Sequence, residues 1–308
     1  MSLFLSSPEE QAHAEPCPAV VLAAALVVGL AVLAAPAAAA SGKVTRLAAT
    51  LDGANEVPGP GDPDGRGRAF VTLAGDQACF LLAWEKIAAP TRAHIHIGPR
   101  GVAGGIVVGF FEAPTGLPDT LHAVAGCVEV DRDLAEAIAA DPRGYYVNIH
   151  TADFPGGAIR GQLHRARHLD LDLPHQLTAR LLGANEVPAA DPDGRGRALV
   201  RVQGDQVCFA LLWTRIGAPI FAHIHQGVAG VNGPVVVLFF DVPEPPGAPV
   251  NMPPLPLPDS ISAVAGCKGD VAASLTRDIR RHPADYYVNV HNAEFPGGAV
   301  RGQLRRLA

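Results

Sequence analysis

The sequence lacks the features that mark several common function classes. Lys and Arg total 24 against 30 Asp and Glu, which gives a formal net charge of -6. No basic stripe and no interleaving of basic and aromatic residues is present, so nucleic acid is not expected as a partner. No serine or cysteine stands in a nucleophile motif of the Gly-x-Ser-x-Gly kind, and no catalytic residue is assigned. The sequence therefore favours a non-enzymatic protein.

Aromatic residues are scarce at 6%, whereas Gly and Pro are abundant at 33 and 28 residues. Frequent Gly and Pro interrupt regular elements, so many short strands are expected rather than long helices. A length of 308 residues leaves room for two ordinary hydrophobic cores.

Most motifs of the chain occur twice. Ala-His-Ile-His begins at Ala93 and again at Ala222, and Tyr-Tyr-Val-Asn-(Ile/Val)-His begins at Tyr145 and again at Tyr286. Each copy then continues through Phe-Pro-Gly-Gly-Ala-(Ile/Val)-Arg-Gly-Gln-Leu. A repeat of this length exceeds the unit of a solenoid, so it predicts two tandem domains of one fold.

We divide the chain into four segments. Residues 1–40 contain an apolar, alanine-rich run followed by small residues, as in a cleaved signal peptide; an uncleaved amino-terminal anchor is the alternative. Residues 44–163 and 176–308 are the two copies, and residues 164–175 form a short charged linker. A signal peptide implies a secreted or periplasmic, cell-envelope location.

Four of the five cysteines fall at matching places in the two copies, as the pairs Cys79 with Cys127 and Cys208 with Cys267. In an exported protein, one pair per domain predicts one intradomain disulfide in each. Each disulfide would close a loop of about fifty to sixty residues and contribute roughly 3–4 kcal/mol in the chain-entropy description. The alternative is four reduced, buried cysteines in a cytosolic protein.

Alternating apolar runs between Gly, Pro and Asp turns predict many strands in each copy. One short helix per copy is also expected, with Asp131 capping residues 134–139 and Asp270 capping residues 271–280. The predicted fold class is all-β, with two tandem Greek-key β-sandwich or barrel domains that each carry one short helix.

Residues i and i+2 of a strand point to the same face, with Cα atoms about 6.5–7 Å apart. His94 and His96 therefore share one face, while Ile95 takes the core face. The same alternation places a polar set on the outside of the sheet in both copies. It comprises His94, His96, Asn148, His150 and Arg160 in the first copy, and His223, His225, Asn289, His291 and Arg301 in the second.

Three converging imidazoles suit copper or zinc. The alternative is that these histidines hydrogen-bond to loop backbone and to Asn148 or Asp153. Arg160 and Arg301, with the asparagines, are candidates for a second shell or an anion guide. The competing interpretation of the arginines is a salt bridge across the hairpin, to Asp153 or Glu294. Asn-Glu-Val-Pro, which occurs in both copies, is interpreted together with the Gly-rich segment after it as a turn.

Taken together, the motifs resemble the CHRD domain, named after chordin. Gly-Ala-Asn-Glu-Val-Pro, a Gly-x-Gly turn, Ala-His-Ile-His, Tyr-Tyr-Val-Asn-(Ile/Val)-His and Phe-Pro-Gly-Gly-Ala-(Ile/Val)-Arg-Gly-Gln-Leu all occur twice. The resemblance implies an exported β-domain whose biochemical role the family does not define. Our leading hypothesis is a non-enzymatic binding or cell-envelope role; the partner is unknown, and an extracellular protein or envelope component is the candidate. The cysteine-dense growth-factor-binding modules of chordin have no counterpart here, so growth-factor binding is not implied.

The sequence is also similar, more faintly, to copper–zinc superoxide dismutase. His94, His96, His150 and Arg160 follow the same order as in that Greek-key barrel, together with one cysteine pair. The bridging histidine and the zinc loop of that family are not visible. The alternative function is therefore a copper- or zinc-binding metalloprotein with three histidines per domain, extending at most to dismutase-like redox activity.

Overall fold

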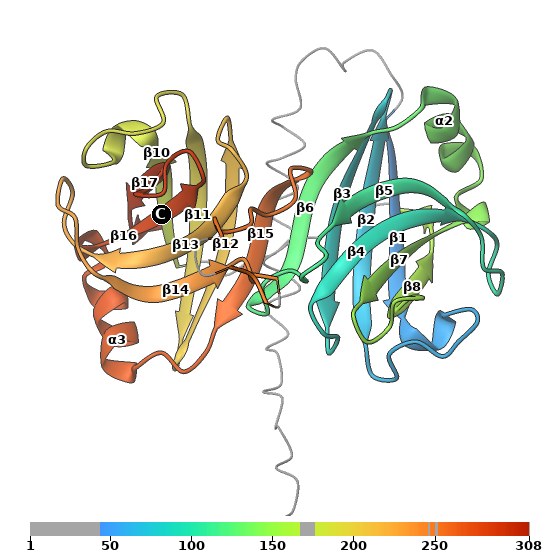
Figure 1. The fold of residues 1–308 in the computed structure, drawn as a ribbon, viewed down its shortest axis with the longest axis horizontal. Helices are drawn as coiled ribbons and strands as arrows, with labels where there is room; N and C mark the ends of the chain where they lie inside the picture. Colours follow the sequence, from blue (N-terminus) through green and yellow to red (C-terminus); the bar gives the residue numbers. More distant parts are fainter. Residues whose placement is uncertain (1–43, 167–175, 246, 250–251, 308) are drawn as a thin grey trace, which may run out of the picture.

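The computed structural model describes residues 44–166, 176–245, 247–249 and 252–307, which form two β-domains side by side (Figure 1). The signal segment expected at residues 1–40 and most of the expected linker lie outside the described residues. Each domain, as far as it is described, is built mainly of strands and carries one short α-helix. The predicted all-β fold class is confirmed. No helix of the described ranges is both long and apolar enough to cross a membrane.

The strands of the first domain form one strongly curved sheet. In chain order they are β1 (Thr45–Asp52), β2 (Arg66–Ala74), β3 (Gln77–Glu85), β4 (Pro90–Ile97), β5 (Ile106–Glu112), β6 (Leu121–Glu129), β7 (Tyr145–Thr151), β8 (Ile159–Gln162) and β9 (His164–Arg165). Pairing orders the longer strands β5-β4-β7-β8-β1-β2-β3-β6. The chain crosses the domain between β3 and β4 and between β6 and β7, as in Greek-key folds. His164 and Arg165, expected in the linker, instead pair with β1 as β9.

The second domain repeats this arrangement. Its strands are β10 (Leu177–Leu182), β11 (Arg195–Gln203), β12 (Gln206–Thr214), β13 (Pro219–Gln226), β14 (Val235–Asp241), β15 (Ile261–Lys268), β16 (Tyr286–Asn292), β17 (Val300–Gln303) and β18 (Arg305–Arg306). They pair in the equivalent order, β14-β13-β16-β17-β10-β11-β12-β15.

The two domains are joined edge to edge, because β6 of the first pairs antiparallel with β15 of the second. Two of the pairs are alanines: Ala123 lies opposite Ala265, and Ala125 opposite Ala263. At one end of this seam, a Cβ atom on Gly126 would lie 1.7 Å from the carbonyl oxygen of Ser260, so only glycine fits. The β6–β15 pairing therefore makes the strands of the two domains one continuous sheet.

The core of each domain lies inside the curved sheet, where alternate residues of every strand meet. Ile95, Val147 and Ile149 are fully buried on this face. Aromatic pairs fill the centre of each domain, with the rings of Phe80 and Phe110 4.7 Å apart in the first. Because side chains alternate along a strand, the polar residues of β4 and β7 lie on the opposite, outer face of the sheet.

The two helices begin differently. The carboxylate of Asp131 accepts a hydrogen bond of 3.0 Å from the backbone N–H of Leu134, so Asp131 caps α2 (Arg132–Ala140) as predicted. The prediction for Asp270 is wrong, because α3 (Ala273–Arg281) has Ala272 at its N-cap and no side-chain cap. Asp270 has φ of 58°, a left-handed turn conformation, and precedes the cap by two residues.

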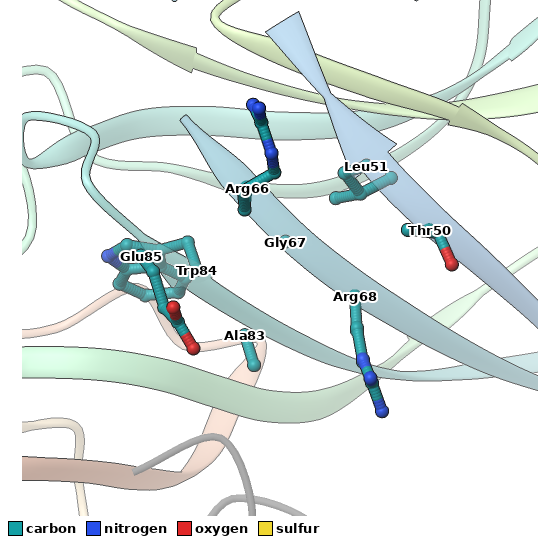
Figure 2. A pocket seen from close by; sticks show the side chains of 8 residues that line it. All are labelled: Thr50, Leu51, Arg66, Gly67, Arg68, Ala83, Trp84 and Glu85. Atoms are coloured by element: carbon teal, nitrogen blue, oxygen red, sulfur yellow. The ribbon is translucent and has the colours of Figure 1, made fainter. Parts of the chain in front are cut away.

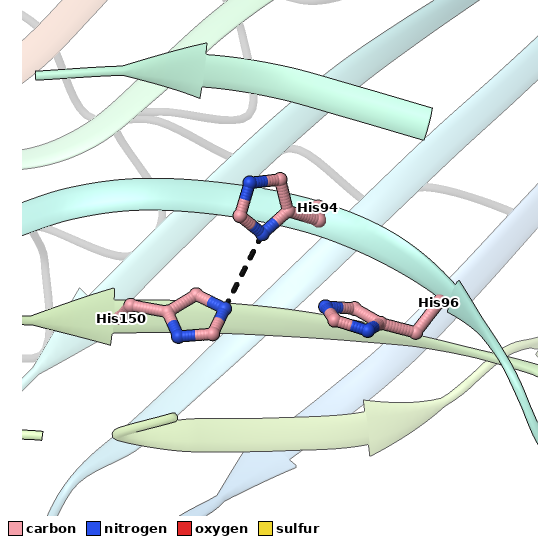
Figure 3. Close-up of side chains that lie close together, drawn as sticks. All are labelled: His94, His96 and His150. Atoms are coloured by element: carbon pink, nitrogen blue, oxygen red, sulfur yellow. Dashed lines mark hydrogen bonds between the residues drawn. The ribbon is translucent and has the colours of Figure 1, made fainter. Parts of the chain in front are cut away.

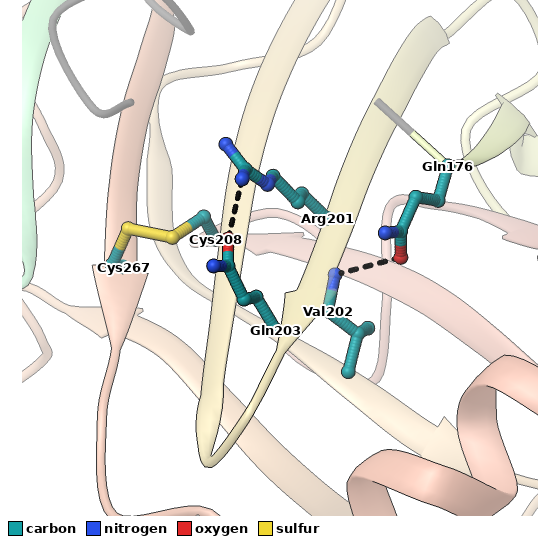
Figure 4. The surroundings of a disulfide bond; sticks show 6 residues. All are labelled: Gln176, Arg201, Val202, Gln203, Cys208 and Cys267. Atoms are coloured by element: carbon teal, nitrogen blue, oxygen red, sulfur yellow. Dashed lines mark hydrogen bonds between the residues drawn. A yellow bond between two sulfur atoms is a disulfide. The ribbon is translucent and has the colours of Figure 1, made fainter. Parts of the chain in front are cut away.

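Both predicted disulfides are present. Cys79–Cys127 links β3 to β6, and Cys208–Cys267 links β12 to β15; each joins directly opposed residues of neighbouring strands. Figure 4 shows the second disulfide near the β11–β12 hairpin, where the backbone N–H of Val202 donates to the Gln176 side chain at 3.4 Å. The bonds close loops with sequence separations of 48 and 59 residues.

Candidate metal centre

Three imidazoles come together in each domain. In the first, potential ligand nitrogens of His94, His96 and His150 all lie within 4.8 Å of one another, and His223, His225 and His291 form the same group in the second. Figure 3 shows the first group, with His94 and His96 projecting from β4 toward His150 on β7. The structure thus brings the predicted residues together; that they bind metal stays a prediction.

The first group is not exposed, although its side chains do point away from the core as expected. His94, His96 and His150 are only 3%, 8% and 4% exposed, because loops fold over the outer face of the sheet. Carbonyl oxygens of two of these loops, at Gly104 and Pro155, hydrogen-bond to the rings. The histidines thus lie on the predicted outer face of the sheet but beneath loops, because strand alternation determines the face and not what covers it.

Hydrogen bonds to the covering loops orient the rings. Nδ1 of His96 lies 2.9 Å from the Gly104 oxygen, and Nδ1 of His150 lies 3.1 Å from the Pro155 oxygen. A carbonyl oxygen can only accept, so each Nδ1 carries the proton and each Nε2 carries a lone pair. The Nε2 lone pairs of His96 and His150 can therefore bind an ion at the centre of the group. His225 and His291 are oriented in the same way by the Gly233 and Pro296 oxygens.

His94 presents its other nitrogen. Its Nε2 lies 3.0 Å from Oε1 of Glu112, so Nε2 carries the proton and Nδ1 faces Nε2 of His150 at 3.3 Å. In neutral rings this contact, dashed in Figure 3, sets two lone pairs against each other. Such an arrangement is repulsive unless a cation or proton lies between them. In the second domain the close contact joins a different pair, Nδ1 of His223 and Nε2 of His225 at 3.3 Å. Within the described residues no acceptor fixes the proton on Nε2 of His223, so this contact can also be an ordinary hydrogen bond from Nδ1 of His223.

Burial holds these rings neutral. It lowers the pKa of His94 and His96, and it lowers that of His150 to about 4. In the second domain burial lowers the pKa of His223 to about 3 and that of His291 to about 4, and it also lowers the pKa of His225. The Nε2 atoms of His96 and His291 are buried and have no hydrogen-bond partner among the described residues. Neutral imidazoles with unshared lone pairs are the form that binds metal.

Arg160 supports the group through Tyr146. The Arg160 guanidinium lies 3.6 Å from the centroid of the Tyr146 ring, and that ring stacks on His96 with centroids 4.9 Å apart. Arg160 also donates to the Val102 carbonyl oxygen at 3.0 Å. The second domain repeats the stack, with Arg301 4.6 Å from the Tyr287 centroid.

The salt bridges expected for the arginines are not formed. Within the described part of the chain, no ion pair joins Arg160 to Asp153 or Arg301 to Glu294. The acidic neighbour is instead Glu56 in the first domain and Glu186 in the second. The hairpin pairs Arg160 with Asn148 across strands, and this directs the guanidinium away from the turn that carries Asp153.

Glu56 and Glu186 are site residues that sequence reasoning missed. Nδ2 of Asn148 donates to Oε2 of Glu56 at 3.3 Å, and a Cβ atom on Gly157 would lie 2.5 Å from the same oxygen. Burial raises the pKa of each glutamate to about 7, against the lowering effect of the neighbouring arginine. The repeated Asn-Glu-Val-Pro was the available signal, but it was interpreted as a turn.

The two groups differ at one edge. Arg92 of the first domain lies opposite His150 on the neighbouring strand, and Phe221 occupies the equivalent place opposite His291. The Phe221 ring packs 4.4 Å from the His291 ring and 5.0 Å from the His223 ring. His223 and His225 are also half-buried, whereas all three histidines of the first group are buried.

A separate pocket of about 260 Å³ lies over β1, β2 and β3 (Figure 2). Its lining includes Arg66, Arg68 and Glu85 but none of the histidines. The side chains that line this pocket do not converge on a common centre in Figure 2, so the imidazole groups are the stronger candidate for the functional site.

Comparison with known families agrees with this repeat. The CHRD domain model matches residues 47–163 and again residues 177–304. The chain belongs to the CHRD-domain family. Each CHRD domain contains one complete imidazole group, and membership supports a non-enzymatic, binding-type domain protein. The two disulfides of this CHRD protein suit an oxidising, extracellular environment. No curated protein matches the chain.

Proposed function

We propose that this CHRD protein is an exported, non-enzymatic binding protein in which each domain holds one copper or zinc ion. The observation that carries the proposal is the approach of His94 Nδ1 to His150 Nε2 at 3.3 Å. Hydrogen bonds on the far side of each ring leave lone pairs on both atoms. A bound cation converts this repulsion into coordination.

Three further observations support the proposal. The same set of nitrogens, one Nδ1 and two Nε2, faces the centre in both domains, although the loop sequences differ. Three imidazoles also satisfy the preference of copper and zinc for nitrogen ligands and leave a fourth position open. The Glu112 carboxylate accepts a hydrogen bond from Nε2 of His94, and carboxylates commonly orient ligating histidines in this way.

Metal analysis of the full chain tests the proposal. Protein stripped with chelator and dialysed against excess copper or zinc should retain about two equivalents, one per group of histidines. The triple variant His94→Ala, His96→Ala, His150→Ala should retain one equivalent. His164→Ala removes an exposed histidine outside both groups and should still retain two. Wild-type protein that retains no metal under excess copper would rule the proposal out.

Export is proposed on the apolar segment within residues 1–40 and on the disulfides. The amino-terminal sequence of protein recovered from the medium or cell envelope tests it. A mature chain beginning near Ser41 is expected. Full-length protein confined to the cytosol, with reduced cysteines, would contradict export.

A further inference from the structure

We infer that the metal of the first domain binds a small anion as an additional ligand, and that Arg92 makes this domain, rather than the second, the anion-binding one. The inference rests on the metal binding proposed above. It concerns inorganic anions of the size of azide, hydroxide or a halide.

The geometry places the Arg92 guanidinium against the imidazole group. Nη2 of Arg92 donates to the Pro155 carbonyl oxygen at 2.7 Å, and Nδ1 of His150 donates to the same oxygen at 3.1 Å. The guanidinium therefore borders the His150 ring at its Nδ1 side, opposite the Nε2 that faces the centre of the group. The Nε atom of Arg92 is buried and has no hydrogen-bond partner in the described structure, so one donor of this cation is unused.

The second domain provides an internal comparison. Phe221 occupies the position of Arg92 and packs on His223 and His291, so the cation is replaced by an apolar ring. Both residues lie opposite an acidic residue of the neighbouring strand. Arg92 lies opposite Glu112, and Phe221 lies opposite Asp241. The difference in local charge between the two edges is therefore the positive charge of Arg92.

This charge matters once a metal is bound. Three neutral imidazoles leave the charge of a divalent ion uncompensated and a coordination position open, so an anion can complete the shell. The positive charge of Arg92 at the edge of the group acts on that anion across the His150 ring and should strengthen its binding by about tenfold. A phenyl ring offers no such attraction.

Solvent access alone predicts the opposite order. His223 and His225 are half-buried, whereas His94, His96 and His150 are all buried, so the second centre is the more open one. If access controlled anion binding, the second centre would bind more tightly. The two explanations therefore predict opposite rankings for the two domains.

Azide titration of copper-loaded full-length protein distinguishes them. One variant, His223→Ala with His225→Ala, leaves only the first centre, and His94→Ala with His96→Ala leaves only the second. Copper content is measured first, and azide binding is then followed by its charge-transfer absorption and by electron paramagnetic resonance. We expect the first centre to bind azide at least about tenfold more tightly than the second.

Exchange of the two residues completes the test. In the first-centre protein, Arg92→Phe should weaken azide binding about tenfold and Arg92→Lys should weaken it less. In the second-centre protein, Phe221→Arg should strengthen binding, which keeps the inference testable if Arg92→Phe fails to fold. Equal azide affinities in the two copper-loaded centres, or tighter binding by the second, would overturn the inference and leave metal binding intact. Absence of copper from both proteins would overturn both.

Discussion

Replacement of Glu56 by glutamine should change how the stability of the first domain depends on pH. Glu56 is 7% exposed, one of its oxygens has no hydrogen-bond partner in the described part of the chain, and its pKa is raised from 4.5 to about 7. Burial disfavours the ionised carboxylate, and the charge of Arg160 only partly offsets that cost. In the folded domain the carboxyl group therefore keeps its proton well above the pH at which the unfolded chain releases it.

The sign follows from proton binding. Below pH 4.5 the carboxyl is protonated in both states, and the stability that the proton confers is fully present. As the pH rises toward 7 the unfolded chain loses the proton first, so the free energy of unfolding of the wild type falls. With one pKa unit equal to about 1.4 kcal/mol, the wild type should lose about 2.5 kcal/mol between pH 5 and pH 8 through Glu56. Glu56→Gln lacks this loss.

Urea unfolding of chelator-treated protein at several pH values measures the effect. Trp84 and Trp213 are the two tryptophans of the chain, one in each domain, so a Trp213→Phe background reports on the first domain by fluorescence. The stability of Glu56→Gln relative to its parent should rise by about 2.5 kcal/mol from pH 5 to pH 8. Histidine ionisation contributes equally to parent and variant and cancels. Glu186→Gln is the matched variant in the second domain.

Parallel stability curves for parent and variant would refute the reasoning. They would mean that the attraction of the Arg160 charge balances desolvation, so that the carboxyl of the folded domain ionises near its ordinary pKa. A fall in relative stability with rising pH would refute it more strongly, because it would show that the carboxylate stabilises the fold.

Three further outcomes are expected from urea unfolding of single variants. Gly157→Ala should lower the free energy of unfolding by about 1–3 kcal/mol, because Gly157 has φ of 144° and a Cβ atom there would meet Glu56. The control is Gly156→Ala, which has open space around it and should change stability by less than about 0.5 kcal/mol. Equal effects of the two variants would contradict this account. Asp131→Ala should lower the free energy of unfolding by about 1 kcal/mol, because it removes the cap of α2. Ala272→Asp should raise it by a similar amount by capping α3, which has no side-chain cap. No gain from Ala272→Asp would show that the backbone there cannot accept the cap. Replacing both cysteines of the first disulfide by alanine should cost about 4 kcal/mol, given its 48-residue separation, and an unchanged urea midpoint would contradict that value.

Prediction from sequence succeeded where the controlling interactions are local. The i, i+2 spacing of His94 and His96 on a strand is sufficient to place both on one face, and the repeat identified His150 as their companion. The disulfides were predictable because each pair recurs and export favours oxidation. The cap at Asp131 was predictable for the same local reason, whereas the left-handed turn at Asp270 had no distinctive sequence signal.

Prediction failed where distant segments meet. Glu56 lies 92 residues from Asn148, its hydrogen-bond partner, and the turn in which it sits gave no reason to place it beside Arg160. The burial of the histidines also depends on loops whose paths no periodicity describes. The predicted salt bridges of Arg160 to Asp153 and of Arg301 to Glu294 are wrong, because residues that are close in sequence across a hairpin need not have side chains in contact.

The amino-acid sequence by itself determined that the protein has two similar β-domains, each with three histidines on one sheet face and one cysteine pair. These features follow from strand alternation and repetition, which operate over a few residues at a time. Tertiary structure decided which ring nitrogens meet, which carboxylate is buried beside the arginine, and that Arg92 and Phe221 occupy equivalent places beside the two centres. Those outcomes depend on loop closure and long-range packing, where the free energy of burying a polar group is balanced by partners far away in the chain.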